Sequence, residues 1–213
     1  MCSSDLKKSE QALLRARDLN PLNTDHWANL ARESKMKGDL DKALAYYVDA
    51  ARLSPHNAQI FNEWGLIYVQ KGAYGEAIAK FQHSLTLDPI YADTYLYLGE
   101  AYRLQDKAEP AIEAYRKAVE LNPKMAQAYT ALGVLYSQQG KLLEARQVFE
   151  RVVVLDPKDM VGHRNLALTY QQLGMITEAI SETKLALQLA PNDTTLQQFL
   201  QQLQQQLGPQ PKP

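Results

Sequence analysis

Prolines recur along this chain at a constant spacing of 34 residues, with no insertion or deletion between them. The series consists of Pro21, Pro55, Pro89, Pro123, Pro157 and Pro191. A fixed period of this length indicates a stack of small structural units, because each unit must occupy an equivalent place beside the next. The period therefore constrains the fold before any single residue is interpreted.

Other residue types keep the same spacing of 34 residues. Small residues form two columns, one made of Ala43, Ala77, Ala111, Ala145 and Ala179, and one made of Gly65, Gly99 and Gly133 with Ala31 and Ala167 at its ends. Chance does not align this many columns. We infer a tandem array of five complete repeats.

Each period contains two helical stretches separated by a turn. Between residues 24 and 57, Trp27, Leu30 and Ala31 recur at the spacing of an amphipathic helix. A second stripe runs over residues 40–53, and Pro55 ends it because proline disfavours the helical conformation of the preceding residue. The repeat unit is therefore a pair of helices.

Turn and cap residues fit this interpretation. Glycine occupies the turn in four repeats and Asp106 replaces it in the other, and both residue types tolerate the left-handed conformation that ends a helix. Thr24 and Asp41 are predicted N-caps. The two small-residue columns are expected to bring the paired helices close together, with aromatic rings filling the space on either side. His163 and Thr183 replace these rings in the fifth repeat, which is expected to be packed less tightly.

The pattern resembles the tetratricopeptide-repeat (TPR) family. The matching residues are Tyr95, Leu98, Gly99, Tyr102, Ala111, Tyr115, Ala118 and Pro123. The resemblance implies an all-α, right-handed superhelical solenoid of antiparallel helix pairs, in which the first helix of each pair lines a concave groove. It also implies a protein-binding function.

The chain divides into four expected segments. These are an N-terminal half-repeat helix (1–21), five tandem 34-residue repeats (22–193), a C-terminal capping helix (194–207) and a disordered tail (208–213). The capping helix is predicted from an apolar stripe that includes Leu196, Phe199 and Leu203, with glutamines covering its other side. A terminal repeat needs such a polar outer face.

The N-terminal half-repeat lacks its partner helix, which leaves three interpretations: a short cap, a homodimer through this edge, or a fragment of a longer protein. Residues 16–26 are similar to the repeat tails that follow the membrane domain in some bacterial O-antigen-ligase-like proteins. That likeness implies an alternative function as an accessory TPR domain of a bacterial membrane protein for surface polysaccharide assembly.

Bulk composition excludes several classes of protein. The 23 basic residues nearly balance the 24 acidic ones, so there is no electrostatic footprint of a nucleic-acid binder. The single cysteine, Cys2, cannot form an internal disulfide. No apolar stretch approaches the ~20 residues of a membrane span. We expect a soluble, cytoplasmic protein, unless the chain is a fragment of a membrane-anchored one.

Residues for catalysis or metal binding are not grouped by the repeat. The four histidines fall in four different columns, and no motif with the spacing of zinc ligands occurs. We therefore expect no enzyme activity, no metal and no cofactor. The function predicted instead is that of a scaffold that binds a partner peptide or helix, with self-association of the repeats as a further alternative.

The candidate binding residues are those between the packing columns of the first helices. They are Asn29, Arg32, Asn62, Glu63, Leu66, Tyr97, Glu100, Arg103, Val134, Arg164, Asn165 and Leu168. Leu66, Val134 and Leu168 share one column, and a solvated face would not normally carry so many apolar groups. Charges are concentrated in the first three repeats, so we expect a ligand to be held by charge at one end and by apolar or amide contacts at the other. The partner is a protein or peptide whose identity the sequence does not reveal.

Overall fold

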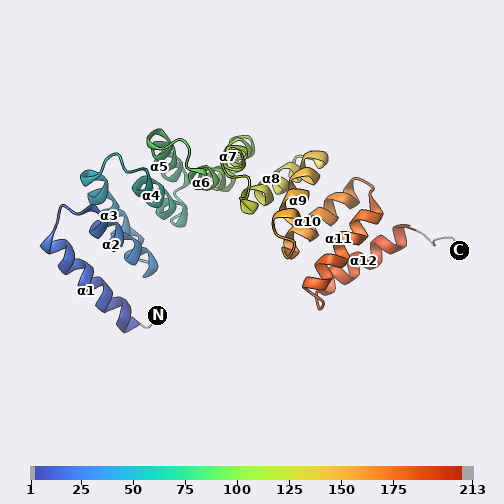
Figure 1. Cartoon of the computed structure of the whole chain (residues 1–213), viewed down its shortest axis with the longest axis horizontal. Helices are drawn as coiled ribbons and strands as arrows, with labels where there is room; N and C mark the ends of the chain where they lie inside the picture. The colour runs from blue at the N-terminus through green and yellow to red at the C-terminus, as the bar shows by residue number, and fades with distance from the viewer. Residues whose placement is uncertain (1–2, 208–213) are drawn as a thin grey trace. The chain divides into compact units, whose positions relative to one another are not determined.

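The computed structural model describes the backbone of residues 3–207 and the side chains of residues 11–207, and this range forms twelve α-helices without a strand (Figure 1). The helices are α1 (Ser3–Leu19), α2 (Thr24–Met36), α3 (Leu40–Leu53), α4 (Ala58–Gln70), α5 (Tyr74–Leu87), α6 (Ala92–Leu104), α7 (Ala108–Leu121), α8 (Ala126–Gln138), α9 (Leu142–Leu155), α10 (Met160–Gln172), α11 (Ile176–Leu189) and α12 (Thr194–Leu207).

The helices follow the 34-residue period of the sequence. The first helix of each pair, such as α2 or α4, has 13 residues, and the second, such as α3 or α5, has 14. First and second helices pack against each other as α2 with α3, α4 with α5, α8 with α9 and α10 with α11. The expected all-α fold of repeated helix pairs is confirmed.

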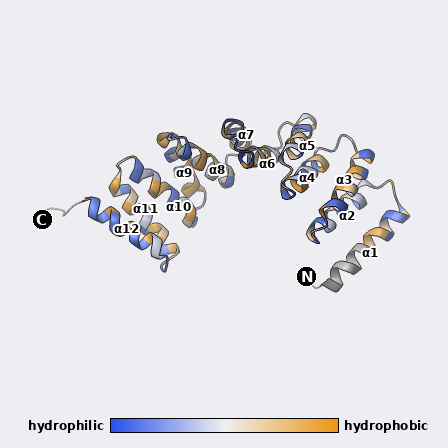
Figure 2. Ribbon diagram, turned by 180° about the vertical axis from the view of Figure 1, so that it is seen from behind, coloured by the Kyte–Doolittle hydropathy of each residue, from blue (hydrophilic) through white to orange (hydrophobic). Residues whose placement is uncertain are grey.

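The chain consists of two compact units, Met1–Ala114 and Tyr115–Pro213, here called the N-terminal unit and the C-terminal unit. Helix α7 runs across the boundary between them. Both hydrophilic and hydrophobic residues occur in every helix from α2 to α12 (Figure 2). In both units the buried residues are mainly hydrophobic, as expected of amphipathic helices.

Buried residues form separate clusters along the repeats. In the N-terminal unit one cluster surrounds Tyr47 and Ile67, and a second surrounds Phe81 and Leu98. In the C-terminal unit a cluster surrounds Phe149. A chain of small cores of this kind is expected for a solenoid, because each repeat contacts only its neighbours.

Two glycines on first helices allow a ring of the paired helix to approach the backbone. A Cβ atom added at Gly65 would lie 2.5 Å from Cε1 of Phe81, and one at Gly133 would lie 2.5 Å from Cε1 of Phe149. Both rings are almost fully buried. The predicted close approach at the small-residue columns is confirmed.

The fifth repeat replaces aromatic rings by polar groups that are also buried. His163 is 5% exposed, its Nε2 donates to the carbonyl oxygen of Pro157 (3.1 Å), and its Nδ1 lies 2.6 Å from a carboxylate oxygen of Glu182. In the first repeat, Trp27 makes the equivalent hydrogen bond to the carbonyl of Pro21. Hydrogen bonds therefore replace the ring contacts at this position, and the looser packing expected for this repeat stays a prediction.

The helix caps differ from the predicted ones. Asn23, not Thr24, caps α2, since its side chain accepts a hydrogen bond from the backbone N–H of Asp25 (2.9 Å). Asp39, not Asp41, caps α3 through the N–H of Lys42 (3.2 Å). The predicted caps lie inside the first turn, where a hydroxyl or carboxylate is equally common and the sequence pattern does not separate the positions.

The turn between paired helices uses the left-handed conformation in every repeat that has a glycine there, with φ between 72° and 82° at Gly38, Gly72, Gly140 and Gly174. Asp106 adopts the same conformation, with φ of 58°. The prediction from the sequence is confirmed at this position.

This geometry predicts opposite effects of two substitutions in the N-terminal unit. The left-handed conformation costs an L-residue about 1–2 kcal/mol, and Asp106→Gly removes this cost from the folded state. Glycine also gives the unfolded chain more conformational freedom, which lowers the stability gained by about 0.4–1 kcal/mol. We expect a net stabilisation of about 0.5 kcal/mol. Gly72→Ala has open space around the new methyl group but retains the strained φ of 74°, so it should destabilise by about 1 kcal/mol. Urea unfolding followed by tryptophan fluorescence measures both, because Trp27 and Trp64 lie in this unit.

The two ends of the array differ in how much apolar surface they leave exposed. Helix α1 packs against α2, but its last residue Leu19 is 87% exposed and Leu22, in the loop after it, is 77% exposed. Helix α12 packs against α11, buries Leu196 and Leu203 and presents glutamines to solvent. The expected disordered tail at 208–213 lies outside the described residues.

Candidate functional site

The predicted groove residues lie on first helices, as the repeat requires, and they fall into one set in each unit. The N-terminal set is on α2, α4 and α6 and consists of Asn29, Arg32, Asn62, Glu63, Leu66, Tyr97, Glu100 and Arg103. The C-terminal set is on α8 and α10 and consists of Val134, Arg164, Asn165 and Leu168. Each set is a surface of its own unit.

A polar cluster centred on Glu63 joins α2, α3 and α4 in the N-terminal set. Arg32 donates to both carboxylate oxygens of Glu63, from Nε (2.7 Å) and Nη2 (2.9 Å). The Tyr47 hydroxyl donates to the same carboxylate (2.7 Å), and Arg32 also donates to Asn29 (2.7 Å). A bidentate arginine–carboxylate pair has defined geometry as well as charge.

The surroundings of this cluster shift the pKa values of Glu63, Tyr47 and Arg32. Burial opposes ionisation of Glu63, but the hydrogen bonds from Arg32 and Tyr47 outweigh it and lower the pKa of the carboxyl. Burial, followed by the hydrogen bond to Glu63, raises the pKa of Tyr47. The hydrogen bond to Glu63 raises the pKa of Arg32 despite its partial burial. Glu63 is therefore ionised and Tyr47 neutral at ordinary pH.

The charges predicted to hold a ligand are paired within the protein instead. Arg32 is paired with Glu63, and Arg103 donates to Glu100 through Nε (2.8 Å) and Nη2 (2.5 Å) on the same helix. Of the two asparagines in the set, Asn29 accepts a hydrogen bond from Arg32, and Asn62 is only 4% exposed. The N-terminal set is thus electrically compensated, which the sequence did not indicate because the Arg32–Glu63 pair joins two repeats.

Two hollows adjoin at Leu168 in the C-terminal unit. The first, of about 180 Å³, lies between α8 and α10 and is lined by Val134, Ser137, Gln138, Phe149, Asn165, Leu168, Thr169 and Gln172. The second, of about 220 Å³, lies between α10 and α12 and is lined by Arg164, Leu168, Thr195, Leu196, Gln198, Phe199 and Gln202. All four predicted residues of this unit line one or both hollows.

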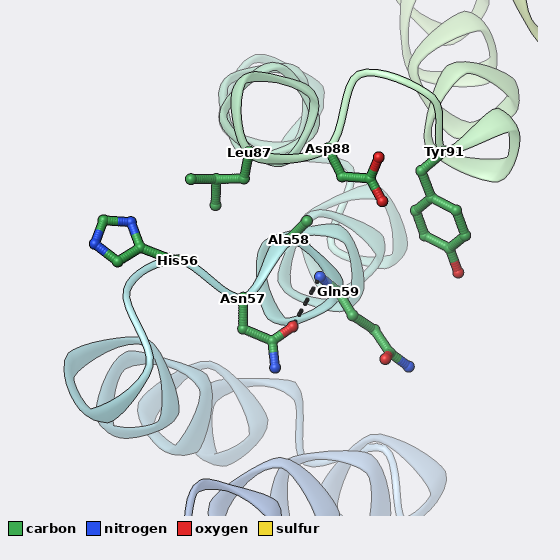
Figure 3. Close-up of a pocket in the computed structure, with 7 residues that line it drawn as sticks. All are labelled: His56, Asn57, Ala58, Gln59, Leu87, Asp88 and Tyr91. Carbon is green, nitrogen blue, oxygen red and sulfur yellow. Dashed lines mark hydrogen bonds between the residues drawn. The ribbon is translucent and has the colours of Figure 1, made fainter.

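A larger hollow of about 610 Å³ lies at the inter-repeat loops of the N-terminal unit (Figure 3). Figure 3 shows Asn57 capping the start of α4 while Asp88 and Tyr91 come from the loop between α5 and α6. Two repeats later, a hollow of about 490 Å³ is lined by Ala126, Gln127 and Asp156 at the equivalent positions. None of these residues belongs to the predicted set. Residues of this kind recur at helix starts and in loops for structural reasons, so their recurrence in the sequence did not indicate a hollow.

Comparison with family models decides the family. Models described as TPR repeat match residues 65–106 and 99–140, and models described as tetratricopeptide repeat match residues 26–57, 126–159 and 165–193. The chain belongs to the tetratricopeptide-repeat family. Members of this family bind peptide or protein partners.

Solved structures of other TPR proteins share this fold. MamA is 27% identical with a TM-score of 0.72, and the match covers 81% of this chain and 94% of MamA. YrrB, described as a TPR protein with an unusual peptide-binding site, is 25% identical with a TM-score of 0.73, over 91% of this chain and 99% of YrrB. PilF of Pseudomonas aeruginosa is 19% identical with a TM-score of 0.78, over 93% and 90% of the two chains, and shows the fold alone.

No curated protein matches the chain. Within residues 3–207, no helix has the length and apolar character needed to cross a membrane. The same part of the chain contains no group of histidine, cysteine and acidic side chains that could hold a metal ion.

Proposed function

We propose that this TPR chain is a non-catalytic scaffold that binds a segment of a partner protein on the first-helix surfaces of its repeats. The observation that carries the proposal is the set of two hollows around Leu168, which combine an apolar lining with amide side chains of α8, α10 and α12. Binding sites for peptides generally combine apolar contacts with a few placed polar groups. The peptide-binding site named for YrrB supports the proposal, since that protein is similar over nearly the whole chain.

The N-terminal set contributes a different kind of surface. Leu66 and Tyr97 are half-buried against the cluster around Phe81, and the ring centroids of Phe81 and Tyr97 lie 6.1 Å apart. The charges of Arg32 and Glu63 neutralise each other, and this ion pair fixes the side chains in the polar part of this face. This surface is suited to apolar and hydrogen-bonding contacts more than to attraction of a charged partner.

A matched pair of substitutions in the C-terminal unit tests where binding occurs. Val134 lies on a first helix and lines a hollow, whereas Val154 lies on a second helix and is 66% exposed. We expect Val134→Asp to weaken binding of partner peptides by about tenfold or more, since a desolvated carboxylate would face apolar groups. Val154→Asp should leave affinity unchanged. Fluorescence anisotropy against a panel of labelled peptides measures the difference.

Circular dichroism of both variants provides the control for folding. Equal affinities for the Val134→Asp, Val154→Asp and unchanged proteins would contradict the proposal for this surface. Leu66→Asp, measured against the same panel, reports separately on the N-terminal set.

Self-association is a second candidate, favoured by the exposure of Leu19 and Leu22 beside α1. Light scattering over a range of concentrations tests it, and a monomer at high concentration would exclude it. The likeness to the repeat tails of O-antigen-ligase-like membrane proteins stays a prediction, and in that setting the same surfaces would serve a membrane enzyme in surface polysaccharide assembly.

A further inference from the structure

The two hollows at Leu168 differ from the rest of the predicted site in their charge. Arg164 lines the hollow between α10 and α12, and no acidic residue lines either hollow. Among the described residues, Arg164 takes part in no recorded ion pair or hydrogen bond, whereas Arg32 and Arg103 are both paired with carboxylates. An uncompensated arginine beside an apolar hollow favours a ligand that brings a carboxylate.

The apolar parts of the two hollows are separate sockets. Val134, Phe149 and Leu168 line the first, and Leu168, Leu196 and Phe199 line the second. An apolar cavity of about 150 Å³ is sufficient to hold a benzene ring. Hollows of about 180 and 220 Å³ therefore each have room for one apolar side chain.

Five amide side chains line the same hollows without a recorded hydrogen-bond partner in the described structure. They are Gln138, Asn165, Gln172, Gln198 and Gln202. An amide can both donate and accept, so it can pair with peptide N–H and C=O groups. These groups are free in an extended segment and already paired within a helix. The amide lining thus favours an extended ligand.

The spacing of the sockets follows from their position on the two sides of α10. They share Leu168 as a common wall, so they are separated by one helix diameter, roughly 10 Å. A polyproline-II segment rises about 3.1 Å per residue with three residues per turn, so residues three apart share a face about 9 Å apart. An extended segment can therefore place apolar residues i and i+3 in the two sockets.

We propose that the C-terminal unit binds an extended protein segment with two apolar side chains three residues apart and an acidic residue beside the one that enters the α10–α12 hollow. Leu168 separates the two apolar side chains, Arg164 receives the carboxylate, and the amides pair with the ligand backbone. This inference rests on the proposed function and names the class of partner for one of its two surfaces.

The test is a selection of nine-residue peptides from a random phage-displayed library on the immobilised full chain, with parallel selections on Leu168→Asp, Leu66→Asp and the control Val154→Asp. We expect enriched sequences with apolar residues at i and i+3 and a neighbouring aspartate or glutamate, recovered on the unchanged chain and the control and lost on Leu168→Asp. Fluorescein-labelled copies of these peptides should bind Arg164→Glu about tenfold more weakly. Replacing the peptide's acidic residue with lysine should restore affinity for Arg164→Glu.

Several outcomes would overturn the proposal. These are enrichment of another spacing or of basic sequences, failure of the charge swap, and the absence of any binder that depends on Leu168. Binders lost on Leu66→Asp but kept on Leu168→Asp would support the general scaffold function while overturning this inference. If the chain self-associates and Leu168→Asp dissociates it, the occupant is a second copy and the proposal is also wrong.

Discussion

Replacing Gly65 with alanine is expected to destabilise the N-terminal unit by about 1–3 kcal/mol, the usual range for overpacking a core. The added Cβ would lie 2.5 Å from Cε1 of Phe81, whereas carbon atoms in favourable contact are about 3.5–4.0 Å apart. Alanine gains about 1 kcal/mol over glycine in helix propensity. The clash outweighs this gain because Phe81 is fully buried and has no free space to move into.

The matched control is the same substitution at Gly75, in the first turn of α5. A Cβ there would meet only the Nε2 atom of Gln105, at 3.7 Å, which is an ordinary contact. Gly75→Ala should therefore stabilise by about 0.5–1 kcal/mol. Urea unfolding followed by tryptophan fluorescence measures both variants, and equal signs for the two would refute the packing argument.

A double substitution isolates the contact itself. Phe81→Leu alone should destabilise through the space it leaves. Combined with Gly65→Ala, it should cost less than the sum of the two single effects, since the smaller side chain makes room for the methyl group. The first repeat combines Ala31 with the ring of Tyr47 at equivalent positions, so a helix pair can accommodate alanine when its surroundings are built for it.

Glu63→Gln is expected to destabilise the N-terminal unit by about 1–3 kcal/mol at neutral pH, because charge-assisted hydrogen bonds from Arg32 and Tyr47 are weakened. The control is Glu100→Gln. Its pair with Arg103 spans one helical turn, and both side chains are well exposed, so its loss should change stability by less than about 0.5 kcal/mol.

The effect of Glu63→Gln should depend on pH in a defined direction. The folded pKa of Glu63 is below its ordinary value of 4.5, so the folded state binds the proton less readily than the unfolded state. The stability that the carboxylate contributes is fully present above about pH 4.5 and is lost as the pH falls through the folded pKa. Unfolding at pH 7 and at pH 3 should therefore show the unchanged and Glu63→Gln proteins converging at low pH. A constant difference would show that the charge is not the cause.

Features that recur within each helix pair could be predicted from the sequence alone. The helix pairs, the left-handed turn at Asp106 and the close approach at Gly65 and Gly133 all follow from periodicity and from the conformations open to each residue type. The repeat makes these predictions strong, because each feature appears several times in equivalent positions. The caps at Asn23 and Asp39 were missed by one or two residues, since several polar residues near a helix start are compatible with capping.

What each groove residue contacts was decided only by the tertiary structure. Arg32 and Glu63 are 31 residues apart in the sequence and pair between α2 and α4, so charges that the sequence assigned to a ligand neutralise each other. Asn62 is buried, whereas Arg164, predicted in the same way, is exposed and has no ion-pair or hydrogen-bond partner among the described residues. The hollows at Leu168 exist because side chains of α8, α10 and α12 leave space between them. The period specifies which helices become neighbours, but the shape and charge of the surface between them depend on how individual side chains fill it.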